Sequence, residues 1–161
     1  FYVLLHNKEL RALIHRITSQ TVLILGCFPP ERKVILDTLR QELRKSGYLP
    51  VFFDCQKPNA QNFLSMISVL ARMARFILAD FTDPKIILQI IPHIVRTMVV
   101  PVQPLLIKEV GKEHPMIATL RRHHKSVLET YWYNDSQDLR LSLEEKVIVS
   151  AEAKIKELKI G

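Results

Sequence analysis

The sequence predicts an α/β domain, a three-layer sandwich with a five-stranded parallel sheet in the flavodoxin-like order 2-1-3-4-5. Two observations predict this class. Short apolar runs typical of buried strands alternate with helical segments five times along the chain. The first run, Thr21–Gly26, is apolar almost throughout and ends in glycine, as expected of a strand covered on both faces. Right-handed crossovers then leave few topologies, and the order 2-1-3-4-5 is the one that we expect.

The expected elements follow one another at short spacing. An amphipathic helix over 8–17 precedes the first strand. Pro30 and Glu31 suit the first turn of the next helix, because proline needs no amide hydrogen there and a carboxylate matches the helix dipole. Ser46 and Gly47 end that helix. The remaining strands are expected at 48–53, 75–80, 99–107 and 126–133, and the remaining helices at 62–73, from 84 to about 91 or 95, at 115–122, and from a capping box at 142–145 to about 158.

The length of 161 residues suits one domain. We expect residues 1–18 to be a helix or linker from a preceding region and residues 19–161 to be the domain, because a chain that opens with Phe1 reads as a piece of a longer protein. Cys27 and Cys55 follow the first two strands and are expected to lie near each other as buried, unreactive thiols. Two isolated cysteines and the lack of a long apolar span favour a cytoplasmic protein without a membrane segment.

The net charge of +7 is spread along most of the chain. Its one local concentration is the run from Arg121 to Lys125, which reads either as a solvated loop or as a site for a phosphate or an acidic partner. The diffuse charge argues against a dedicated nucleic-acid domain and leaves a weak nucleic-acid or anion binder as a third possibility. The histidines lack the spacing of metal ligands, so no metal site is expected.

In the order 2-1-3-4-5 a ligand crevice lies beyond the carboxyl ends of the first and third strands. The residues at this edge do not match the common nucleotide-binding motifs. A dinucleotide fingerprint needs three glycines and a P-loop needs a glycine-rich turn, whereas this edge has one glycine followed by two prolines that lack amide hydrogens. A phospho-receiver site also fails, since no acidic pair follows the first strand. The candidate ligand- or anion-binding residues are Gly26, Cys27, Phe28, Arg32, Lys33, Asp54, Asp80, Thr82 and Asp83.

Two pairs of charged candidates have alternative structural roles. Arg32 and Lys33 oppose the dipole of the helix that they begin, which a bound anion would relieve; alternatively both extend into water. Asp80 and Asp83 follow the third strand and either cap the next helix or contact a ligand.

Four segments together carry a family resemblance: TVLILG at 21–26, PERKVILDTLRQELRKSG at 30–47, YLPVFFD at 48–54 and ARFILADFTDP at 74–84. They resemble the TIR-like superfamily, in particular an uncharacterised bacterial TIR-like domain that closes larger multidomain proteins, some with pentapeptide repeats. The resemblance covers about residues 8–158. It implies a domain that signals by assembling with other copies and, in the enzymatically active members, a glutamate after the third strand that acts at the ribose of NAD.

The chain departs from that pattern between Pro84 and Arg96, where it has no acidic residue. The glutamate is expected near Gln89 or Ile90, and neither side chain supplies the negative charge that stabilises a developing cation at the sugar. The same helix is apolar on all sides, so it is either buried or part of a protein contact. The candidate contact residues are Ile86, Ile87, Ile90 and Ile91.

These observations predict a non-catalytic, self-associating signalling or protein-interaction module at the end of a larger cytoplasmic bacterial protein, with a protein partner or a second copy as its ligand and no cofactor assigned. The alternative is an N-glycosidase that cleaves NAD or another nucleotide. That reading needs a non-standard carboxylate, for which the candidates are Glu31 and Asp80.

Overall fold

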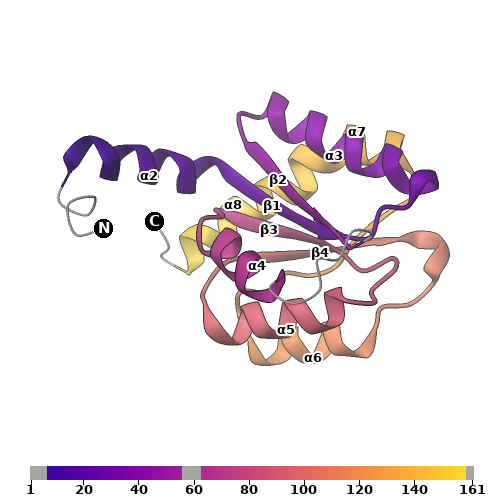
Figure 1. Cartoon of the computed structure of the whole chain (residues 1–161). Helices are drawn as coiled ribbons and strands as arrows, with labels where there is room; N and C mark the ends of the chain where they lie inside the picture. The colour runs from indigo at the N-terminus through magenta and orange to yellow at the C-terminus, as the bar shows by residue number, and fades with distance from the viewer. Residues whose placement is uncertain (1–6, 56–62, 159–161) are drawn as a thin grey trace.

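The computed structural model describes residues 7–55 and 63–158, and these form three layers (Figure 1). The middle layer is a five-stranded parallel sheet in the order β2-β1-β3-β4-β5. The predicted class and strand order are therefore confirmed. The strands are β1 (Thr21–Gly26), β2 (Leu49–Asp54), β3 (Phe76–Asp80), β4 (Val102–Ile107) and β5 (Tyr131–Tyr133).

Helices cover both faces of the sheet. One face carries α3 (Lys33–Lys45), α7 (Ser136–Leu143), the π-helical turn η3 (Glu144–Ile148) and α8 (Val149–Glu157), and the other carries α4 (Phe63–Arg72), α5 (Ile87–Thr97) and α6 (Pro115–His123). Alternate side chains of β1 enter the two cores, with Leu23 and Leu25 on the α5 side and Val22 and Ile24 on the α3 side. This two-sided burial explains why β1 is apolar rather than alternating.

The N-terminal helix α2 (Lys8–Gln20) stands off the end of the sheet (Figure 1). Asn7 caps it, because the Asn7 side chain accepts hydrogen bonds from the amides of Glu9 and Leu10. None of its residues is buried. Gln20 is followed directly by Thr21, so the helix passes into β1 without a loop.

The last strand is shorter than predicted. It was expected over 126–133, but β5 holds only three residues, preceded by one isolated bridge between Val127 and Val102. The reason lies in β4, where Pro104 has no amide hydrogen to give to the neighbouring strand. The Gln103 side chain instead donates to the Glu129 carbonyl at 2.7 Å and to the Pro104 carbonyl at 2.9 Å.

The predicted start of the last helix at Ser142 is also wrong. The helical segment begins at Ser136, capped by Asp135, whose side chain accepts from the amide of Asp138 at 2.9 Å. Asp138 in turn accepts a hydrogen bond from the amide of Asn134. The two carboxylates therefore cap the helix reciprocally, about one and a half turns before the predicted start at Ser142. The Ser142 hydroxyl lies inside the helix and donates to the Asp138 carbonyl.

An ion pair fastens α8 to the amino-terminal end of the sheet. Glu152 accepts two hydrogen bonds from the Arg75 guanidinium, both at 2.7 Å, and one from the Tyr48 hydroxyl at 2.6 Å. The hydrogen bonds from Arg75 hold the pKa of Glu152 below its ordinary value, although partial burial opposes them. Burial and the neighbouring Glu152 raise the pKa of Tyr48.

The lowered pKa of Glu152 predicts a pH-dependent contribution to stability. Because the folded state favours the carboxylate, the contribution is complete above the unfolded pKa of about 4.3 and is lost as the pH falls through the lower folded value. Glu152→Gln is expected to cost on the order of 1 kcal/mol at pH 7, since the pair is partly exposed, and the difference should be smaller at pH 3, where more of the carboxylate is protonated. Urea denaturation at both pH values measures it. Glu145→Gln, on an exposed carboxylate of η3, is the matched control and should change stability little at either pH.

Candidate functional site

The carboxyl ends of β1 and β3 meet at the predicted crevice, where the Phe28 ring closes over Gly26. A Cβ atom on Gly26 would lie 2.6 Å from the Phe28 ring and 3.3 Å from the Asp80 Cβ. Phe28 is 4% exposed, so its ring is part of the core. Glycine is required at position 26 by this close approach.

A buried ion pair spans the same edge. Asp80 is fully buried, and its Oδ2 accepts from the Arg32 guanidinium at 2.9 Å and from the Tyr133 hydroxyl at 2.7 Å. Arg32 also donates to the Tyr133 hydroxyl and to the Cys27 carbonyl, the latter at 3.2 Å. Burial opposes the charge of Arg32, but Asp80 and Tyr133 outweigh it and raise the pKa of the guanidinium. Burial raises the pKa of Tyr133, so its hydroxyl stays protonated and donates.

Thr82 completes this cluster, which we call the Arg32–Asp80–Tyr133 cluster. Its amide donates to the other Asp80 oxygen, Oδ1, at 2.8 Å, and its hydroxyl accepts from the amide of Ile107 at 3.2 Å. Asp80 therefore binds the loop that follows β3 and does not cap α5, whose N-cap has no side-chain hydrogen bond. Asp83 is half-buried and pairs with Lys85 at 3.6 Å.

The two cysteines are joined in a disulfide, with their Cα atoms 4.9 Å apart. The expectation of two unreactive free thiols is therefore wrong, although the expected proximity at the ends of neighbouring strands is correct. Disulfides are typical of oxidising environments, so the cysteine count no longer favours a reducing compartment. The bond links the ends of β1 and β2 beside the Arg32–Asp80–Tyr133 cluster, where the Cys55 amide also donates to the Gly26 carbonyl at 3.1 Å.

The other candidates of this edge lie around the cluster without joining it. Glu31 and Lys33 are exposed in the first turns of η1 (Pro30–Arg32) and α3. The Asp54 backbone pairs with Gly26, and the Asp54 side chain lies outside the described part of the structure. Sequence reasoning placed Arg32 and Asp80 on one edge but did not pair them. It missed Tyr133, whose only signal was its position at the end of the predicted fifth strand.

The apolar helix α5 belongs to the core, which decides between its two interpretations. Ile87 and Ile90 are fully buried and Ile91 is 1% exposed, while Ile86 is half-buried against the same core. These four residues therefore pack in the core of this fold and do not form the interaction surface that the sequence suggested. Gln89, at the position of the expected glutamate, is exposed.

A second region lies along residues 127–131, at the side edge of the sheet formed by β5. A groove of about 490 Å³ runs there between the end of α6 and the helices η3 and α8. We call it the β5-edge groove. It is lined by Gln103, Arg121, Lys125, Val127, Leu128, Glu129, Thr130, Tyr131, Lys146, Ser150 and Lys154. The sequence had singled out the Arg121–Lys125 run but gave no signal that Lys146 and Lys154 face it across the groove.

Arg121 is fixed at the wall of this groove. It donates to the Leu128 carbonyl at 3.1 Å and to Glu113 at 2.5 Å. Thr130 donates to the same Glu113 oxygen. Desolvation raises the pKa of Glu113, but the hydrogen bonds from Arg121 and Thr130 outweigh it and lower the pKa.

Within residues 7–55 and 63–158, no group of three or more His, Cys, Asp or Glu side chains is arranged to hold a metal ion. No helix in this part of the chain is long and apolar enough to cross a membrane. No protein-family model and no curated protein matched the chain.

Proposed function

We propose that this chain is a TIR-like protein-interaction module that self-associates through α2 and does not catalyse a reaction. The observation that carries the proposal is the apolar face of α2. Leu13 is 47% exposed and Ile14 is 45% exposed, and no residue of the helix is buried. Leu10 and Ile17 extend the stripe at helical spacing. An amphipathic helix whose central apolar side chains stay this exposed within the described residues offers a contact surface.

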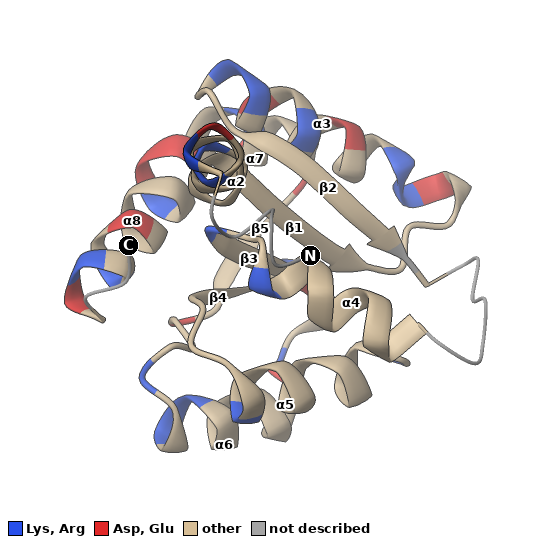
Figure 2. Cartoon of the chain, turned by 60° about the vertical axis from the view of Figure 1, so that its left-hand side comes forward, with Lys and Arg blue, Asp and Glu red and all other residues tan. Residues whose placement is uncertain are grey.

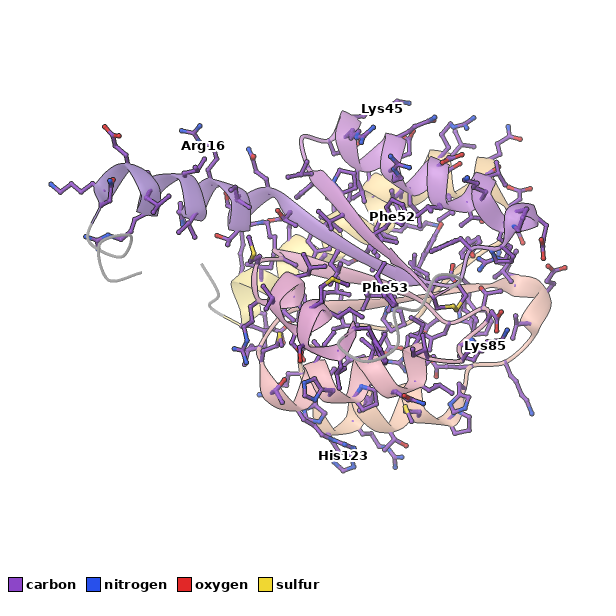
Figure 3. All side chains as sticks on the ribbon, viewed as in Figure 1. Arg16, Lys45, Phe52, Phe53, Lys85 and His123 are labelled. Atoms are coloured by element: carbon purple, nitrogen blue, oxygen red, sulfur yellow. A yellow bond between two sulfur atoms is a disulfide. The ribbon has the colours of Figure 1, made fainter. Side chains whose placement is uncertain are left out.

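The charges beside the stripe favour a second copy in antiparallel orientation. Glu9 and Arg16 lie one heptad apart on the same flank of the apolar face. In an antiparallel pair with its two-fold axis beside Leu13, the Glu9 carboxylate faces Arg16 of the second copy, and the symmetry repeats this pair. Figure 3 shows the Arg16 side chain extended into solvent, away from the body of the domain.

The closed carboxyl edge supports the non-catalytic part of the proposal. Both carboxylate oxygens of Asp80 serve internal donors, and the Phe28 ring covers Gly26. Pro29 and Pro30 provide no amide hydrogen at the start of η1, the turn after β1 that leads into α3, where a flavodoxin-like domain would hold a phosphate. Arg32 and Asp80, two of the residues that would bind or cleave a nucleotide at this edge, are thus engaged in holding the fold.

Light scattering over a concentration series tests the proposal. The 13-residue helix makes a small interface, so we expect weak, reversible dimers at high protein concentration. Leu13→Glu/Ile14→Glu should give a monomer. The matched control Leu141→Glu/Val149→Glu changes two apolar residues on α7 and α8 that are more exposed than Leu13 and Ile14, and it should leave the dimer intact.

A charge exchange tests the orientation. Glu9→Arg and Arg16→Glu should each weaken the dimer, whereas the doubly exchanged chain, or a mixture of the two single variants, should restore it. A wild-type chain that stays monomeric, or dimers that survive Leu13→Glu/Ile14→Glu, would overturn the proposal. Release of nicotinamide from NAD, lost on Glu31→Gln, would contradict its non-catalytic part.

A further inference from the structure

The β5-edge groove exists because the sheet ladder is interrupted beside it. Pro104 cannot donate to the last strand. The last backbone bond before Tyr131 is the one from the Leu128 amide to the Val102 carbonyl, and beyond it the Gln103 side chain holds the chain by donating to the Glu129 carbonyl. β5 is the last strand of the sheet, so its outer side faces the groove. Helix α6 ends on one side of this edge and α8 passes on the other.

The charge around the groove is strongly positive. Arg121, Lys125, Lys146 and Lys154 line it, against a single carboxylate, Glu129, whose side chain is 88% exposed. Figure 2 shows Lys and Arg on α6 and both basic and acidic residues on α8. Cations gathered in a concave surface reinforce one another's potential, which attracts anions and disfavours the empty site.

The partners of these cations leave part of the charge uncompensated. Lys154 pairs with Glu157 at 2.8 Å, and Arg121 is held by Glu113. Lys125 and Lys146 are exposed and make no ion pair within the described residues, although the charge of Lys125 contributes to lowering the pKa of Glu157. The two lysines stand on opposite walls, one after α6 and one on η3.

We propose that the β5-edge groove binds a small molecule that carries two or more phosphate groups. The volume of about 490 Å³ is that of a small-molecule site. A ligand with several phosphates spans both walls, with Lys125 on one and Lys146 on the other. One Nη of Arg121 faces Glu129 at 3.6 Å and becomes available when that exposed carboxylate swings away. A single phosphate reaches one wall only and binds more weakly.

The test titrates the protein with inorganic tripolyphosphate, ATP and orthophosphate at low salt. Trp132, the chain's single tryptophan, is half-buried next to Tyr131 and provides a fluorescence signal, with calorimetry as a second readout. We expect tripolyphosphate and ATP to bind and orthophosphate to bind at least about tenfold more weakly, since it makes fewer charge-assisted contacts. Comparable affinity for tripolyphosphate and ATP indicates recognition of phosphates alone, and a preference for ATP indicates a nucleotide ligand.

Variants with equal charge changes locate the site. Lys125→Gln/Lys146→Gln should weaken tripolyphosphate binding about tenfold or more. Lys108→Gln/Lys112→Gln removes the same charge from exposed residues outside the groove and should have little effect. Glu129→Gln removes the one anion of the lining and should tighten binding, a gain that no folding defect produces.

Three results would overturn the inference. They are no binding of tripolyphosphate at low salt, an equal loss in the two lysine pairs, and tighter binding of a polyglutamate peptide than of tripolyphosphate. None of these four lysines belongs to α2, so both double lysine variants should still form dimers. Failure of phosphate binding would therefore leave the proposed self-association untouched, and the reverse also holds.

Discussion

Replacement of Asp80 by Ala is expected to lower the free energy of unfolding by about 3–5 kcal/mol, because it leaves a buried cation without its counter-ion. Asp80 is fully buried and the Arg32 side chain is 14% exposed. Water therefore cannot fully replace the lost carboxylate. The Tyr133 hydroxyl and the Thr82 amide lose their acceptor in the same step. Urea denaturation followed by circular dichroism measures the loss.

Three variants separate charge from packing at this position. Asp83→Ala removes a neighbouring, half-buried carboxylate with one long ion pair and should cost less than about 1 kcal/mol. Tyr133→Phe deletes one hydroxyl and should cost about 1–3 kcal/mol. Asp80→Ala/Arg32→Met removes both charges and should be more stable than Asp80→Ala alone. If Asp80→Ala is tolerated as well as Asp83→Ala, the ion pair does not hold the edge of the sheet.

Reduction of the disulfide between Cys27 and Cys55 is expected to lower the free energy of unfolding by about 3–4 kcal/mol, because release of a loop closed across 28 residues restores entropy to the unfolded chain. The bond also closes the region that contains α3, so its loss loosens the ends of β1 and β2 together. Denaturation with and without a dithiol reductant gives the difference. Mass spectrometry after thiol alkylation counts the cysteines that have been freed.

The double variant Cys27→Ala/Cys55→Ala is the control. It should unfold at the same urea concentration with and without reductant, close to the midpoint of the reduced wild-type chain. Two alkylated cysteines in folded, never-reduced wild-type protein would contradict the disulfide. An unchanged midpoint on reduction would show that the bond contributes little to stability.

The sheet order was predictable because the signal for it is local. Each strand is an apolar run bounded by a turn, as Thr21–Gly26 illustrates. Because parallel crossovers are right-handed, only a few strand orders are then possible. The errors have a different origin. The length of the last strand depends on Pro104 in the strand beside it. The start of the last helix depends on whether Asp135 or Ser142 provides the N-cap. Asp135 caps the helix earlier than Ser142, and the chain then continues through a π-helical turn.

The candidate site was predictable as a location but not as a set of contacts. The strand order brings residues 26, 32 and 80 to one edge, yet pairing Arg32 with Asp80 requires the side-chain path over Phe28. The burial of α5 was one of two open readings, since an all-round apolar helix suits both a core and an interface. The β5-edge groove combines α6 and α8 from distant parts of the chain, which no local pattern reveals.

The direct passage of α2 into β1 has a mechanical consequence. Because Gln20 is followed by Thr21 with no loop between them, the helix acts as a lever on β1, the second strand of the sheet. A force or torque applied near Asn7 is delivered to β1, whose far end is tied by the disulfide. Two copies joined along this lever would hold their domains at a set distance and angle.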